Sequence, residues 1–536
     1  MANTMRLLVA AVFSLLISLS HTAPTSAITP TATLDSGPVV GTTTSLSGAS
    51  VVVTKYLGIP FAASPTRFAP AARPTSWQKP LNATKYGPAC VQQFNYPEAA
   101  RNRTIAFFNT PPPSGGESED CLNLNVYVPG SSGKNKTVMV WIYVRAGLVQ
   151  FLLGMASLTS FGIGWFPDIR TNVFGFPNSP ELELTKRNLG YLDQRFALDW
   201  VQRNIAAFGG DPKKVTIFGE SAGAASVDSL VTTYPKNPPF RAAIMQSGQT
   251  TLYTNTANNA PRSWLALAAA LNCTSSHPKS NLTCIRSFPA SVIKSTIEHL
   301  ALPFTPVSDN TTNLRYPAAA RVNGSVAPVP ILTGSNADEG SIFVGASGNN
   351  ATAYLSALIP NQPALVATIL AAYPNTTTQL SDILTESIFQ CPAGIAANDT
   401  VTGGNKAWRY YFNATFANTQ LAPGLGVYHA SEIPIVWGTY PRVNATEGEA
   451  RLSAAMQASW AGFAKNPNQT QAGVGGPGFA GVPTVGVWGN GVGVKGDGSG
   501  RLNSSISSGV LDRRCALYRP LYVAQGLATS SSGGGQ

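Results

Sequence analysis

The chain has 536 residues, of which 44% are hydrophobic and only 11% are charged, and its formal net charge is +11. A length prior alone would allow several domains, but the chain shows no internal repeat and no long linker, so we expect a single domain. The lysines and arginines form no block and no stripe interleaved with aromatic residues, which argues against nucleic-acid binding despite the basic balance.

Residues 1–27 predict a signal peptide. One positive charge lies in residues 1–6, an almost wholly apolar run covers residues 7–19, and small residues that suit a cleavage site follow. The apolar run is too short to cross a bilayer comfortably, so we expect a cleaved signal rather than a membrane anchor. No later segment has the pattern of a transmembrane helix. The sequence therefore predicts a secreted protein.

Two further features agree with export. Fourteen Asn-x-Ser/Thr acceptor sites are spread along the chain, which suggests a glycoprotein. The chain has six cysteines, an even number that predicts three disulfides in an oxidising compartment. Spacing favours a pair between Cys273 and Cys284 and leaves the other pairings open. Because the chain has no Cys-x-x-Cys and no cluster of histidines, we expect no structural metal.

Apolar runs alternate with helical patterns along the chain. The predicted strands cover residues 56–61, 124–128, 138–143, 215–218 and 328–334. Residues 192–205 carry apolar side chains at helical spacing, and the glycines and proline of residues 208–212 end this helix and turn the chain. This alternation predicts an α/β fold in which a mostly parallel sheet has helices on both faces.

The C-terminal part has fewer regular patterns. Residues 473–500 are rich in glycine and predict a loop, and residues 527–536 predict a disordered tail. The glycines at 489, 491 and 493 lack the strand and helix of a dinucleotide site, so they do not indicate dinucleotide binding. We therefore expect one α/β domain over residues 28–526.

Ser221 is the most informative residue of the chain. It lies in Gly219-Glu220-Ser221-Ala222-Gly223, directly after the predicted strand 215–218. A strand that ends in Gly-x-Ser-x-Gly and turns sharply into a helix holds the serine hydroxyl where a base and a carbonyl carbon can reach it. This arrangement predicts acyl transfer through a covalent acyl-enzyme.

A serine nucleophile needs a general base, and the chain has only four histidines. His21 leaves with the signal peptide, and His277 lies in the short loop between the paired cysteines. His429 is favoured because it lies in a loop beside an apolar run. His299, at the end of a polar helical stretch, is the second candidate.

The base in turn needs an acid that orients it. Asp338 and Glu339 follow the predicted strand 328–334, at the carboxyl end of a strand where such sites are built. Their position between Ser221 and His429 in chain order is the order found in α/β-hydrolases. A solvated acidic turn is the alternative interpretation of these two residues.

At this point several segments resemble the type-B carboxylesterase and lipase family of α/β-hydrolases. Residues 208–223 resemble its active-serine signature, and residues 119–126, with the sequence Glu-Asp-Cys-Leu-Asn-Leu-Asn-Val, resemble its second signature. Residues 56–61, with Arg67 and Phe68, are similar to its N-terminal strand region. The resemblance covers roughly residues 39–522, apart from one gap, and is closest to the secreted fungal members.

The resemblance implies roles for individual residues. Ser221 matches the nucleophile, Glu339 the acid and His429 the base, while the N–H of Ala222 donates to the oxyanion. Polar residues near the base are matched by Glu220, Ser247 and Glu432. The implied disulfides are Cys90–Cys121, Cys273–Cys284 and Cys391–Cys515.

Residues 144–169 depart from the family pattern. In the family, the strand at 138–143 runs into a glycine triplet whose N–H groups form most of the oxyanion hole, and a second buried, β-branched strand follows. This chain has neither pattern. Loss of a single oxyanion donor typically costs about 10²–10³ in turnover. We therefore expect a damaged oxyanion hole and a sheet that is perturbed around residues 144–169.

Three interpretations of this segment stay open. It is a translated intron or a displaced reading frame, as its abrupt edges and the valine at 144 suggest. Alternatively, the chain is a catalytically impaired binding protein, or an active enzyme whose N–H donors come from residues 145–147. With these alternatives, the resemblance implies a secreted serine carboxylic-ester hydrolase that uses a Ser-His-Glu triad and no cofactor. Its substrate is a small-molecule ester or, for a lipase, a long-chain acylglycerol.

Overall fold

The structure is a computed structural model of the whole chain. It describes residues 29–44, 52–94, 96–108, 112–130, 133–142, 163–250, 260–273, 279–347, 349–469, 483–489 and 502–529.

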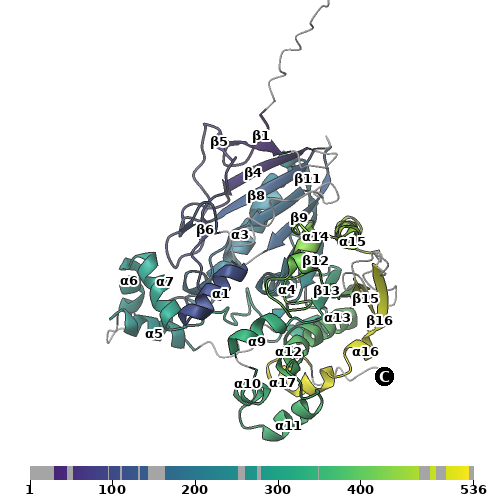
Figure 1. Cartoon of the computed structure of the whole chain (residues 1–536). Helices are drawn as coiled ribbons and strands as arrows, with labels where there is room; N and C mark the ends of the chain where they lie inside the picture. The colour runs from purple at the N-terminus through teal and green to yellow at the C-terminus, as the bar shows by residue number, and fades with distance from the viewer. Residues whose placement is uncertain are drawn as a thin grey trace, which may run out of the picture.

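An 11-stranded sheet runs through the molecule (Figure 1). From β10 to β15 neighbouring strands are parallel, and antiparallel pairs complete both edges. In spatial order the strands are β16 (Asn503–Ser507), β15 (Thr484–Trp488), β14 (Ala407–Phe412), β13 (Ile331–Asn336), β12 (Ala242–Gln246), β11 (Gly210–Glu220), β9 (Lys136–Ile142), β10 (Ile163–Pro167), β8 (Asn123–Pro129), β4 (Val53–Pro60) and β3 (Thr42–Thr44). The predicted α/β class with a mostly parallel sheet is confirmed.

Two small sheets and many helices surround the large sheet. The small sheets contain β1 (Thr31–Thr33), β2 (Pro38–Val40) and β5 (Leu81–Asn82), and β6 (Ala89–Cys90) with β7 (Glu117–Ser118). The helices are α1 (Glu98–Phe108), α2 (Asn172–Gly175), α3 (Leu189–Asn204), α4 (Ala222–Thr233), α5 (Arg262–Ala270), α6 (Lys279–Ser287), α7 (Ala290–His299), α8 (Pro317–Val322), α9 (Ser341–Ser347), α10 (Ala351–Leu358), α11 (Pro363–Ala371), α12 (Gln379–Leu384), α13 (Cys391–Thr402), α14 (Ile433–Trp437), α15 (Glu447–Lys465), α16 (Ser508–Leu511) and α17 (Arg519–Ala524). A π-helical segment, η5 (Thr385–Gln390), joins α12 to α13.

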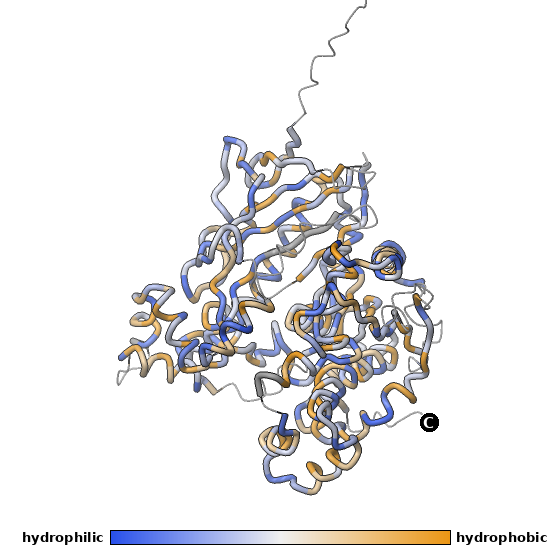
Figure 2. The backbone as a smooth tube through the Cα atoms, in the orientation of Figure 1, coloured by the Kyte–Doolittle hydropathy of each residue, from blue (hydrophilic) through white to orange (hydrophobic). Residues whose placement is uncertain are grey.

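Hydrophobic layers cover both faces of the large sheet. Because side chains alternate along a strand, the neighbours Ile217 and Phe218 of β11 enter different core clusters. Ile217 belongs to the cluster of Leu198 on α3 and Val227 on α4. Phe218 packs on the other face, where its ring centroid lies 5.3 Å from that of Trp437 on α14. The long helix α15 is amphipathic, and its coil in Figure 2 carries both hydrophilic and hydrophobic colours.

The predicted elements up to the serine are present. The strands predicted at 56–61, 124–128, 138–143 and 215–218 correspond to β4, β8, β9 and β11, and the helix predicted at 192–205 is α3. Gly209 has the left-handed φ of 86° that the predicted turn requires. The structure begins β11 at Gly210, and the register against β9 shifts between Gly210 and Val215.

The expected loss of a strand in residues 144–169 is wrong. β10, which lies inside this segment, pairs parallel with β9 and antiparallel with β8. The expectation relied on a β-branched run, whereas residues 163–167 read Ile-Gly-Trp-Phe-Pro. Aromatic residues also favour strands, and the open edges of β9 and β8 supply backbone partners for any extended segment. Residues 143–162 lie outside the described residues.

The loop predicted over residues 473–500 also contains a strand. β15 pairs parallel with β14 and antiparallel with β16. Val485, Val487 and Trp488 are buried, so alternating apolar side chains within the glycine-rich sequence are enough to complete the sheet. The remainder of the predicted loop lies outside the described residues, except for residue 483 and Gly489.

The three implied disulfides are present: Cys90–Cys121, Cys273–Cys284 and Cys391–Cys515. The C-terminal packing extends slightly further than the boundary expected for the tail. Leu527 donates its N–H to the carbonyl of Tyr522 at 2.8 Å, and Ala528 is buried. In the described parts of the chain, no helix has the length and apolar character needed to cross a membrane.

Candidate active site

Ser221 forms a one-residue turn between β11 and α4. β11 ends at Glu220, α4 begins at Ala222, and the backbone of Ser221 has φ 56° and ψ −123°. The N–H of Ser221 donates to the carbonyl of Gln246 at 2.9 Å. A Cβ on Gly219 would lie 2.5 Å from the carbonyl oxygen of Ile142, so a side chain at this position would collide with β9. The structure therefore contains the strained strand-to-helix turn that the sequence predicts.

His429 and Glu339 form a buried pair. The Nδ1 of His429 lies 2.6 Å from Oε2 of Glu339, and both side chains are almost completely shielded from solvent. The other carboxylate oxygen of Glu339 accepts the N–H of Asn336 at 2.7 Å. Glu339 follows β13 at its carboxyl end, and this position lets a strand from the sheet set the orientation of the imidazole.

The neighbouring Asp338 binds the backbone of the histidine loop and not the imidazole. Its carboxylate accepts the backbone N–H of Val427 at 2.8 Å, two residues before His429. Asp338 and Glu339, which follow β13, therefore bind the histidine loop at two points: Asp338 binds its backbone at Val427, and Glu339 binds the ring of His429. The two acidic residues are not a solvated turn: Glu339 is buried, and Asp338 is hydrogen-bonded to the loop.

The other ring nitrogen of His429 faces Glu220. Its Nε2 lies 3.1 Å from Oε1 of Glu220, the residue directly before Ser221. Burial alone lowers the pKa of His429, but the negative charges of Glu220, Glu339 and Glu432 raise it to about 9. In this arrangement the imidazole is held mainly as the imidazolium ion at neutral pH.

Glu432 lies in a buried polar cage behind the histidine. Its two carboxylate oxygens accept hydrogen bonds from Gln246 at 3.0 Å and from Asn336 at 2.7 Å. Gln246 in turn accepts the indole N–H of Trp460 at 3.0 Å. Burial and the charge of Glu339 raise the pKa of Glu432. Glu432 therefore acts on the histidine through its charge and through Asn336, whose backbone N–H donates to the carboxylate of Glu339.

Ser247 contributes mainly through its backbone. It is fully buried, has a φ of 51°, and donates its N–H to the carbonyl of Gly334 at 2.9 Å. The next residue, Gly248, is so close to the elbow that a Cβ on it would lie 2.2 Å from the carbonyl oxygen of Ser221. This tight packing holds the turn of Ser221 against the end of β12.

Two aromatic side chains flank the histidine ring, and the sequence reasoning missed both. The ring centroids of Phe343 and Phe389 lie 5.2 Å and 4.6 Å from that of His429, and the two phenyl rings stack on each other at 6.1 Å. Phe343 is four residues after Glu339, so helical spacing could have suggested it. Phe389 is distant from every motif in the sequence and carries no such signal.

The remaining candidates lie elsewhere. His299, at the end of α7, is exposed, with its Nδ1 2.7 Å from the carbonyl oxygen of Ser295 and its ring against that of Tyr96. His21, His277 and residues 145–147 lie outside the described residues. The N–H of Ala222, the first residue of α4, remains the candidate oxyanion donor in the described chain.

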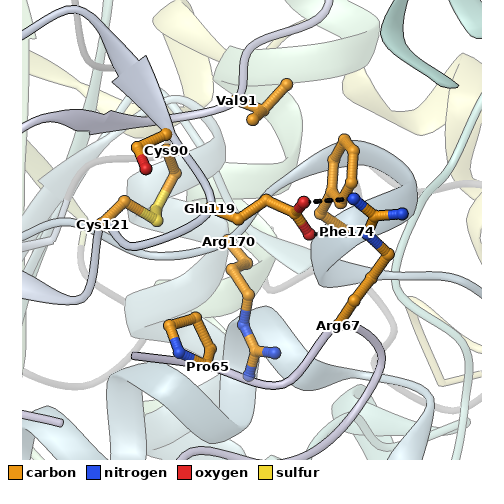
Figure 3. A pocket seen from close by; sticks show the side chains of 9 residues that line it. Pro65, Arg67, Cys90, Val91, Glu119, Cys121, Arg170 and Phe174 are labelled. Carbon is orange, nitrogen blue, oxygen red and sulfur yellow. Dashed lines mark hydrogen bonds and ion pairs between the residues drawn. A yellow bond between two sulfur atoms is a disulfide. The ribbon is translucent and has the colours of Figure 1, made fainter. Parts of the chain in front are cut away.

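A small cavity near Cys90 and Cys121 is not an ester site, because it has room for roughly one water molecule. Figure 3 shows Arg67 and Glu119 joined across it, with Nε of Arg67 2.7 Å from Oε1 of Glu119. The same guanidinium donates to the carbonyl of Phe288 after α6. These contacts fasten the disulfide-closed segment to the helices beside it. The described residues contain no group of three or more side chains that could hold a metal ion.

The mostly parallel sheet, the strand–serine–helix turn and the adjacent imidazole–carboxylate pair define a hydrolase of the α/β type. A family model described as "Carboxylesterase family" matches residues 28–480, and the chain belongs to this family of carboxylic ester hydrolases.

Relatives from distant organisms support the assignment. The chain is 34% identical to an acetylcholinesterase of Bungarus fasciatus, over 78% of this chain and 75% of that protein. It is 30% identical to a chlorogenic acid esterase of Aspergillus niger, over 78% of this chain and 79% of that protein. It is also 30% identical to a para-nitrobenzyl esterase of Bacillus subtilis, over 80% of this chain and 89% of that protein.

Proposed function

We propose that the chain is a secreted serine carboxylic-ester hydrolase in which Ser221 is the nucleophile, His429 the general base and Glu339 the orienting acid. The observation that carries the proposal is the 2.6 Å contact between Glu339 and His429 beside the strained turn of Ser221. An orienting carboxylate, a base and a serine hydroxyl on a sharp turn are the parts that acyl transfer needs.

In the first half of the reaction, His429 acts in its neutral form, with Nε2 deprotonated: this nitrogen turns from Glu220 to the hydroxyl of Ser221 and takes its proton as the oxygen attacks the ester carbonyl. The new bond joins Ser221 to the acyl carbon, and the N–H of Ala222 donates to the oxyanion. His429 then gives its proton to the departing alcohol. Glu339 keeps the proton on Nδ1 throughout, which fixes the tautomer.

In the second half, water takes the place of the alcohol. His429 removes a proton from the water as it attacks the acyl carbon, and returns it to the oxygen of Ser221 when the acid leaves. The carboxylates of Glu220, Glu339 and Glu432 favour the imidazolium that forms in both halves. Because His429 rests as the imidazolium at neutral pH, the proton on Nε2 must first leave to solvent before this nitrogen can accept the proton of Ser221.

The oxyanion hole departs from the family pattern that the sequence otherwise follows. β10 restores the strand that the sequence lacked, but residues 143–151 read Tyr-Val-Arg-Ala-Gly-Leu-Val-Gln-Phe and contain no glycine triplet. A chain with only the N–H of Ala222 would turn over about 10²–10³ more slowly for each missing donor. We expect either a weak enzyme or a natural product whose sequence differs here.

The secreted state is supported by the apolar N-terminus and by three disulfides, which form in oxidising compartments. The aromatic rings beside His429 lie on the side of the base, from which the alcohol departs, and they favour esters with apolar alcohol groups. Soluble short-chain esters and emulsified long-chain acylglycerols should be compared directly, because a lipase would prefer the emulsion.

A fluorophosphonate that reacts with activated serines tests the proposal. Labelling of the secreted protein that disappears in Ser221→Ala supports the enzyme, and labelling should also fall in His429→Gln. A well-folded protein that takes no label would instead support a hydrolase-like binding protein. Peptide mass spectrometry across residues 139–176 of the native protein decides whether residues 144–169 occur as written.

A further inference from the structure

A π-helical turn carries two contacts to the proposed site. η5 interrupts an otherwise continuous helix between α12 and α13, and π turns of this kind are rare and frequent at functional sites. From this turn Phe389 packs on the ring of His429, with centroids 4.6 Å apart. Thr385, from the same turn, accepts the N–H of Gly340 at 2.9 Å, directly after Glu339. One short segment therefore touches the base and the backbone that carries the acid.

The side of η5 that faces the proposed active site is tightly packed. A Cβ on Gly340 would lie 2.1 Å from the carbonyl oxygen of Ser381 on α12, so the helix packs against bare backbone. Phe389 is buried and stacks on Phe343, which belongs to the helix that follows Glu339. A shift of η5 would therefore move both the ring of Phe389, which contacts His429, and the hydrogen bond between Thr385 and Gly340.

The opposite side of η5 is held by a polar cluster. Glu386 is 8% exposed. Nε of Arg514 lies 3.0 Å from Oε1 and 2.9 Å from Oε2 of its carboxylate, and Nη2 of the same guanidinium also donates to Oε1. The hydroxyl of Tyr373 donates to Glu386 at 2.6 Å and lies 2.6 Å from the hydroxyl of Tyr518. The guanidinium of Arg514 also lies 4.1 Å from the ring centroid of Tyr373. We name Tyr373, Glu386, Arg514 and Tyr518 the polar clamp.

The C-terminal segment supplies further bonds to the same turn. The hydroxyl of Tyr522 donates to the carbonyl of Ser387 at 2.5 Å, and the side chain of Gln390 donates to the carbonyl of Leu511 at 2.8 Å. The disulfide Cys391–Cys515 closes the end of η5. Residues 511–522 are more than 100 positions away in sequence, so tertiary contacts hold η5 in place against the C-terminal segment.

The loss of solvation energy on burying these charges indicates that the polar clamp has a role beyond packing. Burying a carboxylate with a guanidinium loses solvation energy that the pair often fails to recover, and apolar side chains of similar volume are frequently as stable. Fork-shaped bonds to Arg514 and a directed hydroxyl fix the orientation of Glu386 in a way that apolar packing would not. The cluster is therefore suited to setting the position of η5.

From these contacts we infer that Glu386 is a positioning residue of the active site, which acts through η5 on His429 and on the backbone after Glu339. The inference rests on the proposed function. When the clamp is intact, Phe389 and Thr385 hold the base and the acid in reacting geometry. When it is loosened, the fold survives, but the pair loses its alignment with Ser221.

Glu386→Gln keeps the size of the side chain and removes its charge, and it is the first test variant. We expect kcat for a soluble p-nitrophenyl ester to fall about tenfold to a hundredfold, since misplacement of about 1 Å costs this much, while KM changes little. Arg514→Lys keeps the charge without the fork and should give a smaller loss of the same kind. It also serves if Glu386→Gln fails to fold.

Glu298→Gln is the matched control. Glu298 is 4% exposed, accepts the N–H of Phe94 at 3.0 Å and pairs with Arg101 at 3.4 Å, on α7. It should lose thermal stability like Glu386→Gln and keep its kcat. If both variants lose stability and both keep kcat, Glu386 is merely structural and the inference is wrong.

A double-mutant cycle with Phe389→Leu tests the route. If Glu386 acts through Phe389, the kcat of the double variant should be hardly lower than that of Phe389→Leu alone, because the effects of two substitutions that act through one contact are not additive. Fully additive losses of kcat would overturn the inference that Glu386 acts through this ring.

A readout without turnover separates this inference from the proposed function. In NMR spectra with labelled histidine, the ring resonances of His429, assigned by their loss in His429→Gln, should move in Glu386→Gln and stay in place in Glu298→Gln. Wild-type protein that takes no fluorophosphonate would refute the proposed function while leaving this result intact. An unmoved His429 resonance in Glu386→Gln would refute the positioning role alone.

Discussion

Glu220 should control the pH at which the base becomes available. Its carboxylate lies 3.1 Å from Nε2 of His429, and among the charges that raise the pKa of this histidine to about 9 it is the largest. An opposite charge at this range typically shifts a pKa by about 1–3 pH units, so Glu220→Gln should bring the pKa of His429 down to between about 6 and 8. The imidazole would then be a free base closer to neutral pH.

The pH profile of kcat/KM in the free enzyme is the assay. In the wild-type protein the rate should rise with pH up to about 9, where His429 loses its proton. In Glu220→Gln this acid limb should move to lower pH, and the plateau should fall, because the imidazolium of the transition state loses a negative neighbour. Identical acid limbs in the two proteins would refute the reasoning.

Stability gives a second, independent measure of the same interaction. The pKa of His429 is raised in the folded state, from 6.5 to about 9, so its stabilising effect is complete below pH 6.5 and disappears as pH rises through about 9. The difference corresponds to about 3 kcal/mol for this buried group. Urea denaturation at pH 6 and pH 10 should show this loss in the wild-type protein and a smaller one in Glu220→Gln.

Three further predictions concern the elbow, a buried acid and a disulfide. Gly219→Ala would bring a Cβ within 2.5 Å of the carbonyl oxygen of Ile142, so fluorophosphonate labelling should be lost even in protein that is still secreted. Burial raises the pKa of Asp399 to about 6. The ionised carboxylate therefore destabilises the fold above that pH, and the effect is absent below 3.8, where the group is protonated in both states. Asp399→Asn should raise the free energy of unfolding by about 2 kcal/mol at pH 8 and leave it unchanged at pH 3.5. Removing Cys391–Cys515, which spans 124 residues, should cost about 3–5 kcal/mol in urea denaturation, and a loss under 1 kcal/mol would contradict the chain-entropy argument.

The parts of the site that the sequence predicts are those with a local signature. Gly219 and Ser221 are recognisable because a sharp turn from a strand to a helix needs a glycine against β9 and a residue that tolerates positive φ. Glu339 is recognisable because it follows a buried strand. The choice of His429 over His299 depended on the apolar residues that follow it, and the structure shows the same difference as burial against exposure.

The parts that the sequence could not predict depend on contacts between distant segments. Phe389 contacts His429 from a π turn, and that turn is hydrogen-bonded to residues 511–522, far away in sequence. β10 and β15 were missed because glycine or proline interrupts their β-branched and aromatic residues, whereas in the fold both segments pair with neighbouring strands. Glu220, the neighbour of Nε2 of the base, was expected only as a polar residue nearby, since its 3.1 Å contact depends on the rotamer of the histidine.

The charge around His429 bears on whether the chain is an enzyme or a binding protein. Glu220, Glu339 and Glu432 are all buried, and a buried carboxylate costs several kcal/mol unless a positive partner or hydrogen bonds compensate it. Here the compensating cation is the imidazolium of His429, and it exists only while the histidine holds a second proton. A ligand-binding surface gains nothing from such a cluster, whereas acyl transfer creates this imidazolium in each of its transition states. The electrostatics of the described site therefore favour catalysis.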